Sequence, residues 1–144
     1  MDTAALPHPP DLHYLVEHQT WARLGDDGTA RVGITALGVQ LAGEVYMCRP
    51  RAVGSEVEQG RSIAVVELAK SIVSVKSPVR GTVVQVNETL ATRPELVHLD
   101  PYGEGWIAVV ALADLAADQA GLVHGDAVPA AMARHAWLHR VQER

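Results

Sequence analysis

Short runs of β-branched residues, separated by turn residues, occupy most of the chain, and a pattern rich in alanine and leucine follows them. Such runs predict strands when Gly, Pro, Asn or Asp bound them. The clearest runs are residues 29–34, 62–68, 71–76, 82–86 and 106–112. Short strands with turn signals at close intervals predict a mainly β protein, built as a small antiparallel sandwich or barrel.

The first hairpin is predicted around a glycine-rich turn. Residues 13–24 have a loose apolar pattern that predicts one or two short strands. The tetrapeptide Gly25-Asp26-Asp27-Gly28 is a strong turn signal, so we expect residues 29–34 to fold back on the preceding strand. Residues 94–105, which lack such a pattern, are predicted to form a loop.

A short helix is predicted near residue 38. Thr35 can cap its start, and Gly43 can end it. The segment that follows, residues 44–48, predicts a strand that closes at Arg49-Pro50.

The C-terminal pattern is helical. Residues 115–120 and 128–141 are rich in Ala and Leu, and Pro129 suits the first turn of the second helix. We therefore expect three parts in the chain. These are a flexible N-terminal lead-in over residues 1–11, one domain over residues 12–113, and a C-terminal helical extension over residues 114–144 that packs on it.

Composition narrows the class of protein. The chain has 144 residues, of which 48% are hydrophobic and none is Phe, so we expect a core of Val, Leu, Ile and Ala. A net charge of -5 without clustered basic residues argues against nucleic acid and anionic membranes as partners. The sequence shows neither a signal peptide nor an apolar run of about 20 residues. With one cysteine, these features favour a cytoplasmic location.

The candidate chemistry centres on Lys70. Only Ala69 and Lys70 stand between two β-branched runs, which places the lysine on a tight turn. A lysine there is commonly a solvated charge that discourages edge pairing. This one has the acid Glu67 three residues before it and a Pro-Val-Arg-Gly turn soon after it at residues 78–81.

The order of the surrounding motifs resembles the glycine-cleavage H-protein family, over residues 12–112. The matching pieces are VGIT at 32–35, VGSEVEQG at 53–60, AVVELAKSIVSVKSPVRG at 64–81, VNETL at 86–90, PELV at 94–97 and DPYGEGW at 100–106. The resemblance implies a lipoyl-domain-like flattened β-barrel or sandwich (a barrel-sandwich hybrid). It also implies a non-catalytic carrier with lipoate amide-linked to Lys70, and it makes Glu67 part of the surface that a ligase or partner recognises.

What the family implies for function is a swinging arm. The lysine stem and its lipoyl group would visit several enzymes while the sandwich stays rigid. The implied partners are a lipoate ligase or lipoyl transferase, dihydrolipoamide dehydrogenase, and either the glycine-cleavage enzymes or a heterodisulfide-reductase-like complex.

Departures from the family pattern lie near the arm. The usual His-Glu-Trp is replaced by His18-Gln19-Thr20-Trp21, and the usual Asn after Pro-Glu-Leu-Val by His98. The segments Thr-Trp-Ala-Arg at 20–23 and Leu-Ala-Gly at 41–43 resemble the lipoate-binding proteins linked to heterodisulfide-reductase-like sulfur oxidation. We therefore expect a carrier for sulfur oxidation. The alternatives are a true glycine-cleavage H protein that carries the aminomethyl group, and an interaction module without lipoate.

Other candidate sites are less specific. Cys48 in a strand-like run is typical of a small buried hydrophobe. His13 with His18, and His135 with His139, have spacings that could bind zinc, but no third ligand is evident and solvent-facing histidines are expected. No Ser/His/Asp set, phosphate loop or dinucleotide motif occurs in the sequence. We therefore expect no enzyme activity, against the rival idea of a small hydrolase, and no metal site.

Overall fold

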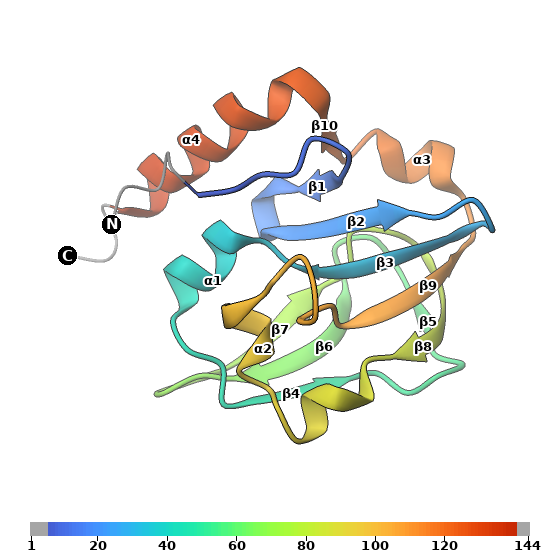
Figure 1. Cartoon of the computed structure of the whole chain (residues 1–144). Helices are drawn as coiled ribbons and strands as arrows, with labels where there is room; N and C mark the ends of the chain where they lie inside the picture. Colours follow the sequence, from blue (N-terminus) through green and yellow to red (C-terminus); the bar gives the residue numbers. More distant parts are fainter. Residues whose placement is uncertain (1–5, 141–144) are drawn as a thin grey trace.

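The computed structural model describes residues 6–140, and it places two antiparallel sheets face to face with helices at their edges (Figure 1). The larger sheet has the strand order β10-β1-β2-β3-β9-β8-β5. Its strands in chain order are β1 (His13–Leu15), β2 (Thr20–Leu24), β3 (Thr29–Ile34), β5 (Glu56–Val57), β8 (Gly81–Val86), β9 (Ala108–Leu112) and β10 (Val123–His124). The predicted hairpin around residues 25–28 is confirmed, with Leu24 paired to Ala30.

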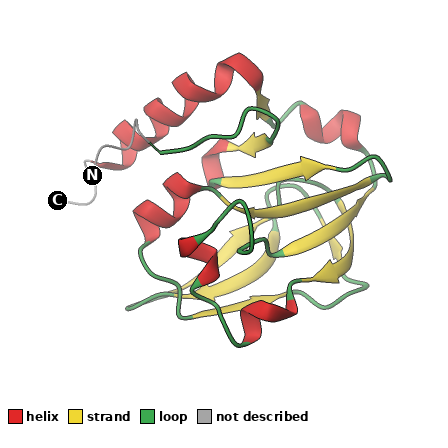
Figure 2. Cartoon of the chain, viewed as in Figure 1, coloured by secondary structure: helices red, strands yellow, loops and turns green. Residues whose placement is uncertain are grey.

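The smaller sheet has the order β4-β6-β7 and carries the lysine hairpin. Its strands are β4 (Met47–Pro50), β6 (Ser62–Glu67) and β7 (Ile72–Lys76). The two sheets do not close into a barrel, and Figure 2 shows their strands with the helices around them. The predicted mainly β sandwich, with a short helix near residue 38 and C-terminal helices, is confirmed.

Within the described residues, four α-helices and three short 3₁₀ turns surround the sheets. The helices are α1 (Ala36–Ala42), α2 (Leu96–Leu99), α3 (Leu115–Gln119) and α4 (Val128–Arg140). The 3₁₀ turns are η2 (Val16–His18), η3 (Glu88–Ala91) and η4 (Gly125–Ala127). Within residues 6–140, none of these helices has the length and apolarity that crossing a bilayer requires.

Helix α1 begins and ends where its sequence predicts. The Thr35 hydroxyl accepts a hydrogen bond from the Gly38 N–H at 2.9 Å. Gly43 follows the last turn at φ 95°, where a side chain would be strained, and its N–H donates to the Val39 carbonyl at 2.8 Å. The helix is fixed at both ends and can serve as a rigid wall.

Three predictions about local structure were wrong or incomplete. The strand expected over residues 44–48 is β4, which starts later and runs through Pro50; it is an edge strand, where a missing N–H is tolerated. The loop expected over residues 94–105 contains α2. Strand β10 was not predicted, because it forms only two residue pairs with β1. Residues 1–5 of the predicted lead-in, and Val141 of the predicted helix, lie outside the described residues.

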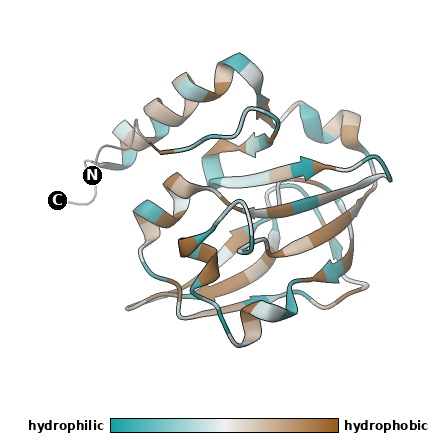
Figure 3. Ribbon diagram, viewed as in Figure 1, coloured by the Kyte–Doolittle hydropathy of each residue, from teal (hydrophilic) through white to brown (hydrophobic). Residues whose placement is uncertain are grey.

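Two apolar clusters form the core. The first lies between the sheets and consists of Val, Ile, Ala and Leu, together with Cys48, as the composition predicts. The second lies under α4 and is built around the fully buried rings of Tyr14 and Trp21, with Met132 and Ala136 from the helix. Figure 3 shows hydrophobic colour along the inner strands and on parts of α4. The second cluster docks the C-terminal helix on the sandwich.

The DPYGEGW segment is a structural brace. The Pro101 carbonyl accepts a hydrogen bond from the Trp21 indole N–H at 3.1 Å. The Tyr102 hydroxyl accepts from the Ala36 N–H and donates to the Pro7 carbonyl, both at 2.9 Å. These bonds tie β2, the start of α1 and the N-terminal segment to one loop, so the motif stabilises the fold rather than performing chemistry.

Candidate functional site

Lys70 lies at the tip of the β6–β7 hairpin. Glu67 pairs with Ile72 in the ladder, and the Leu68 N–H donates to the Ser71 carbonyl at 2.8 Å. Only Ala69 and Lys70 therefore remain outside the hydrogen-bonded strands, and both are exposed. The structure places this lysine where the sequence predicts it, exposed on a tight turn between two strands.

The chain contains a second lysine, and its setting differs. Lys76 ends β7, pairs with Ser62 across the hairpin and is half-buried. These two are the only lysines in the sequence, against ten arginines. An enzyme that acylates a lysine amine therefore has one freely presented target, Lys70.

Glu67 is exposed at the end of β6, three residues before Lys70. Its backbone carbonyl accepts the Tyr46 N–H at 2.8 Å, which ties this end of the hairpin to the chain leading into β4. Among residues 6–140 the one ion pair joins Arg93 to Glu95, so the Glu67 carboxylate is not held by Lys70. Both charges at the hairpin tip face solvent.

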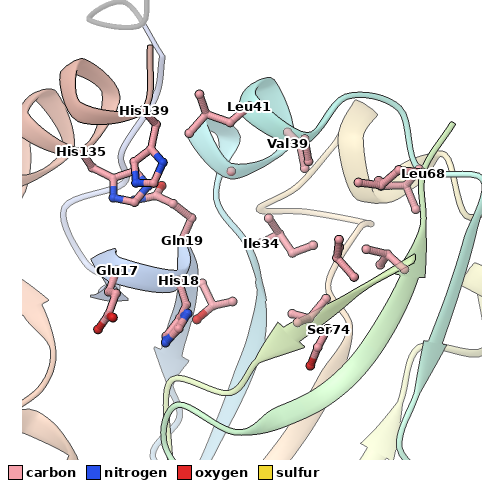
Figure 4. A pocket seen from close by; sticks show the side chains of 17 residues that line it. Glu17, His18, Gln19, Ile34, Val39, Leu41, Leu68, Ser74, His135 and His139 are labelled. Atoms are coloured by element: carbon pink, nitrogen blue, oxygen red, sulfur yellow. The ribbon is translucent and has the colours of Figure 1, made fainter. Parts of the chain in front are cut away.

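A cleft of about 320 Å³ opens beside this hairpin, as Figure 4 shows. Leu68 lies at the hairpin end of the cleft, and His135 and His139 of α4 lie at the opposite end. Its walls are mostly apolar and come from β6, β7, α1, η2, β2, β3 and α4. The lining residues are Glu17, His18, Gln19, Thr20, Ile34, Gly38, Val39, Leu41, Ala42, Val45, Val66, Leu68, Val73, Ser74, Val75, His135 and His139.

Gln19 fixes the wall between η2 and α4. Its backbone is left-handed at φ 55°, an unusual conformation for a residue other than glycine. Its side-chain N–H donates to the Val16 carbonyl at 2.8 Å and to the Met132 sulfur at 3.4 Å, while its amide oxygen accepts from Thr35 at 2.6 Å. This buried network preorganises the cleft, and no local pattern in the sequence predicts it.

The polar end of the cleft carries two neighbouring histidines whose rings are tilted against each other. The ring centroids of His135 and His139 lie 4.1 Å apart. Both side chains are half-buried, so the prediction that they face solvent was wrong. Burial lowers the pKa of His135, and the neighbouring His139 lowers it further. His135 is thus kept neutral at pH values where an isolated histidine begins to gain a proton.

The other histidine pair considered for zinc does not form. His13 stacks on His124 of β10, with ring centroids 3.9 Å apart, instead of meeting His18. No group of three or more His, Cys, Asp or Glu side chains suited to a metal ion occurs within residues 6–140. Cys48 is buried in the first core cluster, as predicted, and burial raises the pKa of its thiol to about 12.

The match to a known protein family covers nearly the whole domain. The family model described as glycine cleavage H-protein matches residues 12–135. The chain belongs to this H-protein family. Members of the family are non-catalytic carriers that hold lipoate covalently on a lysine, which confirms the predicted family, carrier class and cofactor.

Individual H proteins agree with this assignment. The glycine cleavage system H protein of Mycobacterium avium strain 104 is 44% identical over 109 residues, covering 76% of this chain and 82% of that protein. Glycine cleavage system H protein 2 of Aquifex aeolicus is 40% identical over 118 residues, covering 82% and 73%. The crystal structure of an H protein from Mycobacterium marinum superposes with a TM-score of 0.68 at 32% identity, covering 74% of this chain and 87% of that one.

The residues present fit a lipoyl group. A primary amine stands free on a hairpin tip that its own ladder holds rigid. Beside it lies an apolar cleft that can cover a hydrocarbon chain and a sulfur ring. The α4 side of this cleft was not predicted, because the i, i+4 spacing of His135 and His139 does not reveal what the helix packs against.

Proposed function

We propose that Lys70 is the lipoyl attachment residue and that the chain is the lipoyl carrier of glycine cleavage, passing an aminomethyl group between enzymes. The observation that carries the attachment is the contrast between the two lysines, one free at a hairpin tip and one half-buried in a strand. Glu67, exposed beside the tip, is proposed to form part of the surface that the attaching enzyme reads.

The chain's own residues would hold and shelter the arm. The lipoyl group, once attached, supplies a dithiolane that can accept a carbon group on sulfur and exchange between disulfide and dithiol. The closed turn at Leu68 and Ser71 fixes the base of the arm, while the methylene stem of Lys70 supplies its reach. The apolar residues of β6, β7 and α1 that line the cleft would exclude water from the far end of the arm.

The charge of the cleft favours an amine as cargo. Glu17 is the single formally charged residue among those that line it, and neither Lys nor Arg is among them. An anionic sulfur group would meet a carboxylate and no fixed positive charge, whereas an ammonium group would be attracted. The relatives are likewise named for glycine cleavage. Both observations favour the glycine-cleavage alternative over the sulfur-oxidation role expected from the sequence.

The proposed partners follow from this choice. They are glycine decarboxylase, aminomethyltransferase and dihydrolipoamide dehydrogenase, in addition to the lipoate ligase or lipoyl transferase that would modify Lys70. Each would have to reach the exposed hairpin tip, where Ile72 is also exposed beside the lysine.

Intact-mass measurement with a lipoate ligase tests the attachment. We expect the wild-type chain to gain one lipoyl group, Lys76→Arg to gain the same group, and Lys70→Arg to gain none. Arginine keeps the charge but lacks an acylable amine, so the two variants form a matched pair. A mass gain that survives Lys70→Arg would contradict the assignment.

The cargo is tested with the modified protein from the same experiment. We expect glycine decarboxylase to release CO₂ from glycine in the presence of the lipoylated chain and to release little with the Lys70→Arg protein. A lipoylated chain that the decarboxylase does not use would leave the carrier assignment intact and overturn the glycine-cleavage role.

A further inference from the structure

The coil between α1 and β4 joins one wall of the cleft to the base of the lysine hairpin. We call this coil, residues 43–46, the α1–β4 link. At its start, the Gly43 N–H donates to the last turn of α1 at 2.8 Å, and at its end the Tyr46 N–H donates to the Glu67 carbonyl of β6 at 2.8 Å. Between them, Val45 lines the cleft and is only 2% exposed. The way this link is held therefore bears on both the cleft and the hairpin.

A histidine from α2 holds the middle of the link. The Val45 N–H donates to Nδ1 of His98 at 2.9 Å, and α2 lies beside α1 (Figure 1). A backbone N–H can only donate, so Nδ1 accepts, and the neutral ring carries its proton on Nε2. Within residues 6–140, this ring is the one hydrogen-bond acceptor of the Val45 N–H.

Protonation of His98 removes this acceptor. An imidazolium ring has an N–H on both nitrogens, so Nδ1 and the Val45 N–H would face each other as two donors. Because Val45 is buried, its N–H would lose a partner that water does not readily replace. The link is therefore held in the middle only while the ring of His98 is neutral.

A carboxylate next to the ring favours its release once it is charged. Glu44 and His98 both line a surface hollow of about 230 Å³, whose other lining residues are uncharged. Glu44 is exposed and accepts a hydrogen bond from the Tyr46 hydroxyl at 3.1 Å. A charged ring is attracted by this carboxylate, whereas a neutral ring gains more from the Val45 N–H.

The other charged groups near His98 already have partners. Glu95, one turn earlier at the start of α2, pairs with Arg93 at 3.6 Å. Asp100, which follows α2, accepts the Glu104 N–H at 2.8 Å. Helix α1 contributes no titratable side chain. Glu44 is therefore the carboxylate that a charged His98 meets first.

We propose that His98 is a pH-dependent latch on the α1–β4 link, closed when its ring is neutral and open when its ring is protonated. The residue stands where the family pattern usually has Asn. The side-chain oxygen of Asn accepts a hydrogen bond at any pH, whereas the Nδ1 of His accepts only in the neutral ring. The link is thus held at about pH 7.5 and loosened at about pH 5.5, since histidine gains its proton between these values. The consequence for the lipoyl arm rests on the proposed function, but the latch itself does not.

Hydrogen exchange of the Val45 amide in the unlipoylated full chain tests the latch. After correction for intrinsic rates, we expect this amide to exchange about tenfold faster at about pH 5.5 than at about pH 7.5, while amides of β8 keep their protection. Protection of Val45 that does not change with pH would overturn the proposal. Because no lipoate is present, this outcome is independent of whether Lys70 is modified.

Two substitutions at the same position separate the acceptor from the titration. His98→Asn keeps an acceptor but cannot gain a proton in this range, so we expect the Val45 amide to stay protected at both pH values. His98→Phe keeps a ring but has no acceptor, so the amide should exchange rapidly at both. His18→Asn, at an exposed histidine of the cleft, should keep the wild-type response. A wild-type pH response in the His98→Asn protein would overturn the proposal.

The tautomer of the wild-type ring gives a test that needs no substitution. We expect nitrogen NMR of His98 to show the proton on Nε2 at about pH 7.5, and both nitrogens protonated at about pH 5.5. A neutral ring with its proton on Nδ1 would overturn the proposal, because it could not accept from Val45.

Discussion

At the scale of single residues, the buried groups are mostly matched to a partner. Asp118 is one example, because its carboxylate accepts the Arg80 N–H at 2.8 Å and its carbonyl accepts from the Gln59 side chain at 2.8 Å. It is almost fully buried. Burial raises the pKa of its carboxyl, an effect that the hydrogen bond from Arg80 only partly offsets. A neutral side chain would therefore suit this position better than an ionised one.

Replacement of Asp118 by Asn should reveal the cost of burying the ionised carboxylate. A raised carboxyl pKa means that the fold prefers the protonated form, so the contribution of Asp118 to stability is greatest below the ordinary value of about 4 and is lost as the pH rises through the raised value. Asn keeps an oxygen for Arg80 without the charge. We expect Asp118→Asn to melt at a higher temperature than wild type near neutral pH, with the difference shrinking towards about pH 4.

The exposed neighbour on the same helix supplies the control. Asp114 caps α3 by accepting the Ala117 N–H at 3.2 Å, and Asn is an equally good cap. Because the charge of Asp114 makes only a smaller contribution to the raised pKa of Asp118, Asp114→Asn should show a weaker trend in thermal denaturation than Asp118→Asn. If Asp118→Asn loses more stability near neutral pH than at acid pH, the desolvation argument fails.

At the scale of secondary-structure elements, α1 links the cleft to the core. Its N-cap residue Thr35 has two buried roles, since its hydroxyl accepts from Gly38 at 2.9 Å and donates to the Gln19 amide oxygen at 2.6 Å. Gln19 in turn holds Met132 of α4. One hydroxyl therefore stabilises the helix start and the wall between η2 and α4.

Thr35→Ala should cost more than the loss of an ordinary cap. The missing cap costs about 1–2 kcal/mol, and the unpartnered Gln19 oxygen adds about 1–3 kcal/mol. We expect Thr35→Ser, which keeps the hydroxyl, to lose less than half as much in urea denaturation. Equal losses in the two variants would show that the methyl group, not the hydroxyl, sets the stability here.

At the scale of the whole molecule, the sequence predicts those elements whose determining residues lie close together along the chain. The hairpins at residues 25–28 and 69–70 and the capped helix α1 follow from turn residues and capping residues within a few positions of one another. The cleft does not, because Gln19, Val39, Val73 and His135 meet only after the chain has folded. Strand β10 also escapes prediction, since two residue pairs leave no periodic pattern.

The same distinction applies to the candidate site. Lys70 stands out in the sequence because two β-branched runs flank it, and its exposure follows from the two-residue turn. The pairing of His13 with His124 could not be predicted, because it depends on how β10 docks against β1. The docking is decided by Tyr14 and Trp21, whose burial requires a cover.

The burial of Cys48 has a consequence for a protein that bears a redox-active sulfur pair. A nearby thiolate would attack the oxidised pair, break its S–S bond and form a mixed disulfide, which would withdraw the pair from exchange with the intended enzyme. The chain has one cysteine, and it is enclosed in the core on the inner face of β4, with a pKa far above neutrality. The scaffold therefore presents no accessible thiolate of its own to the sulfur pair that it bears.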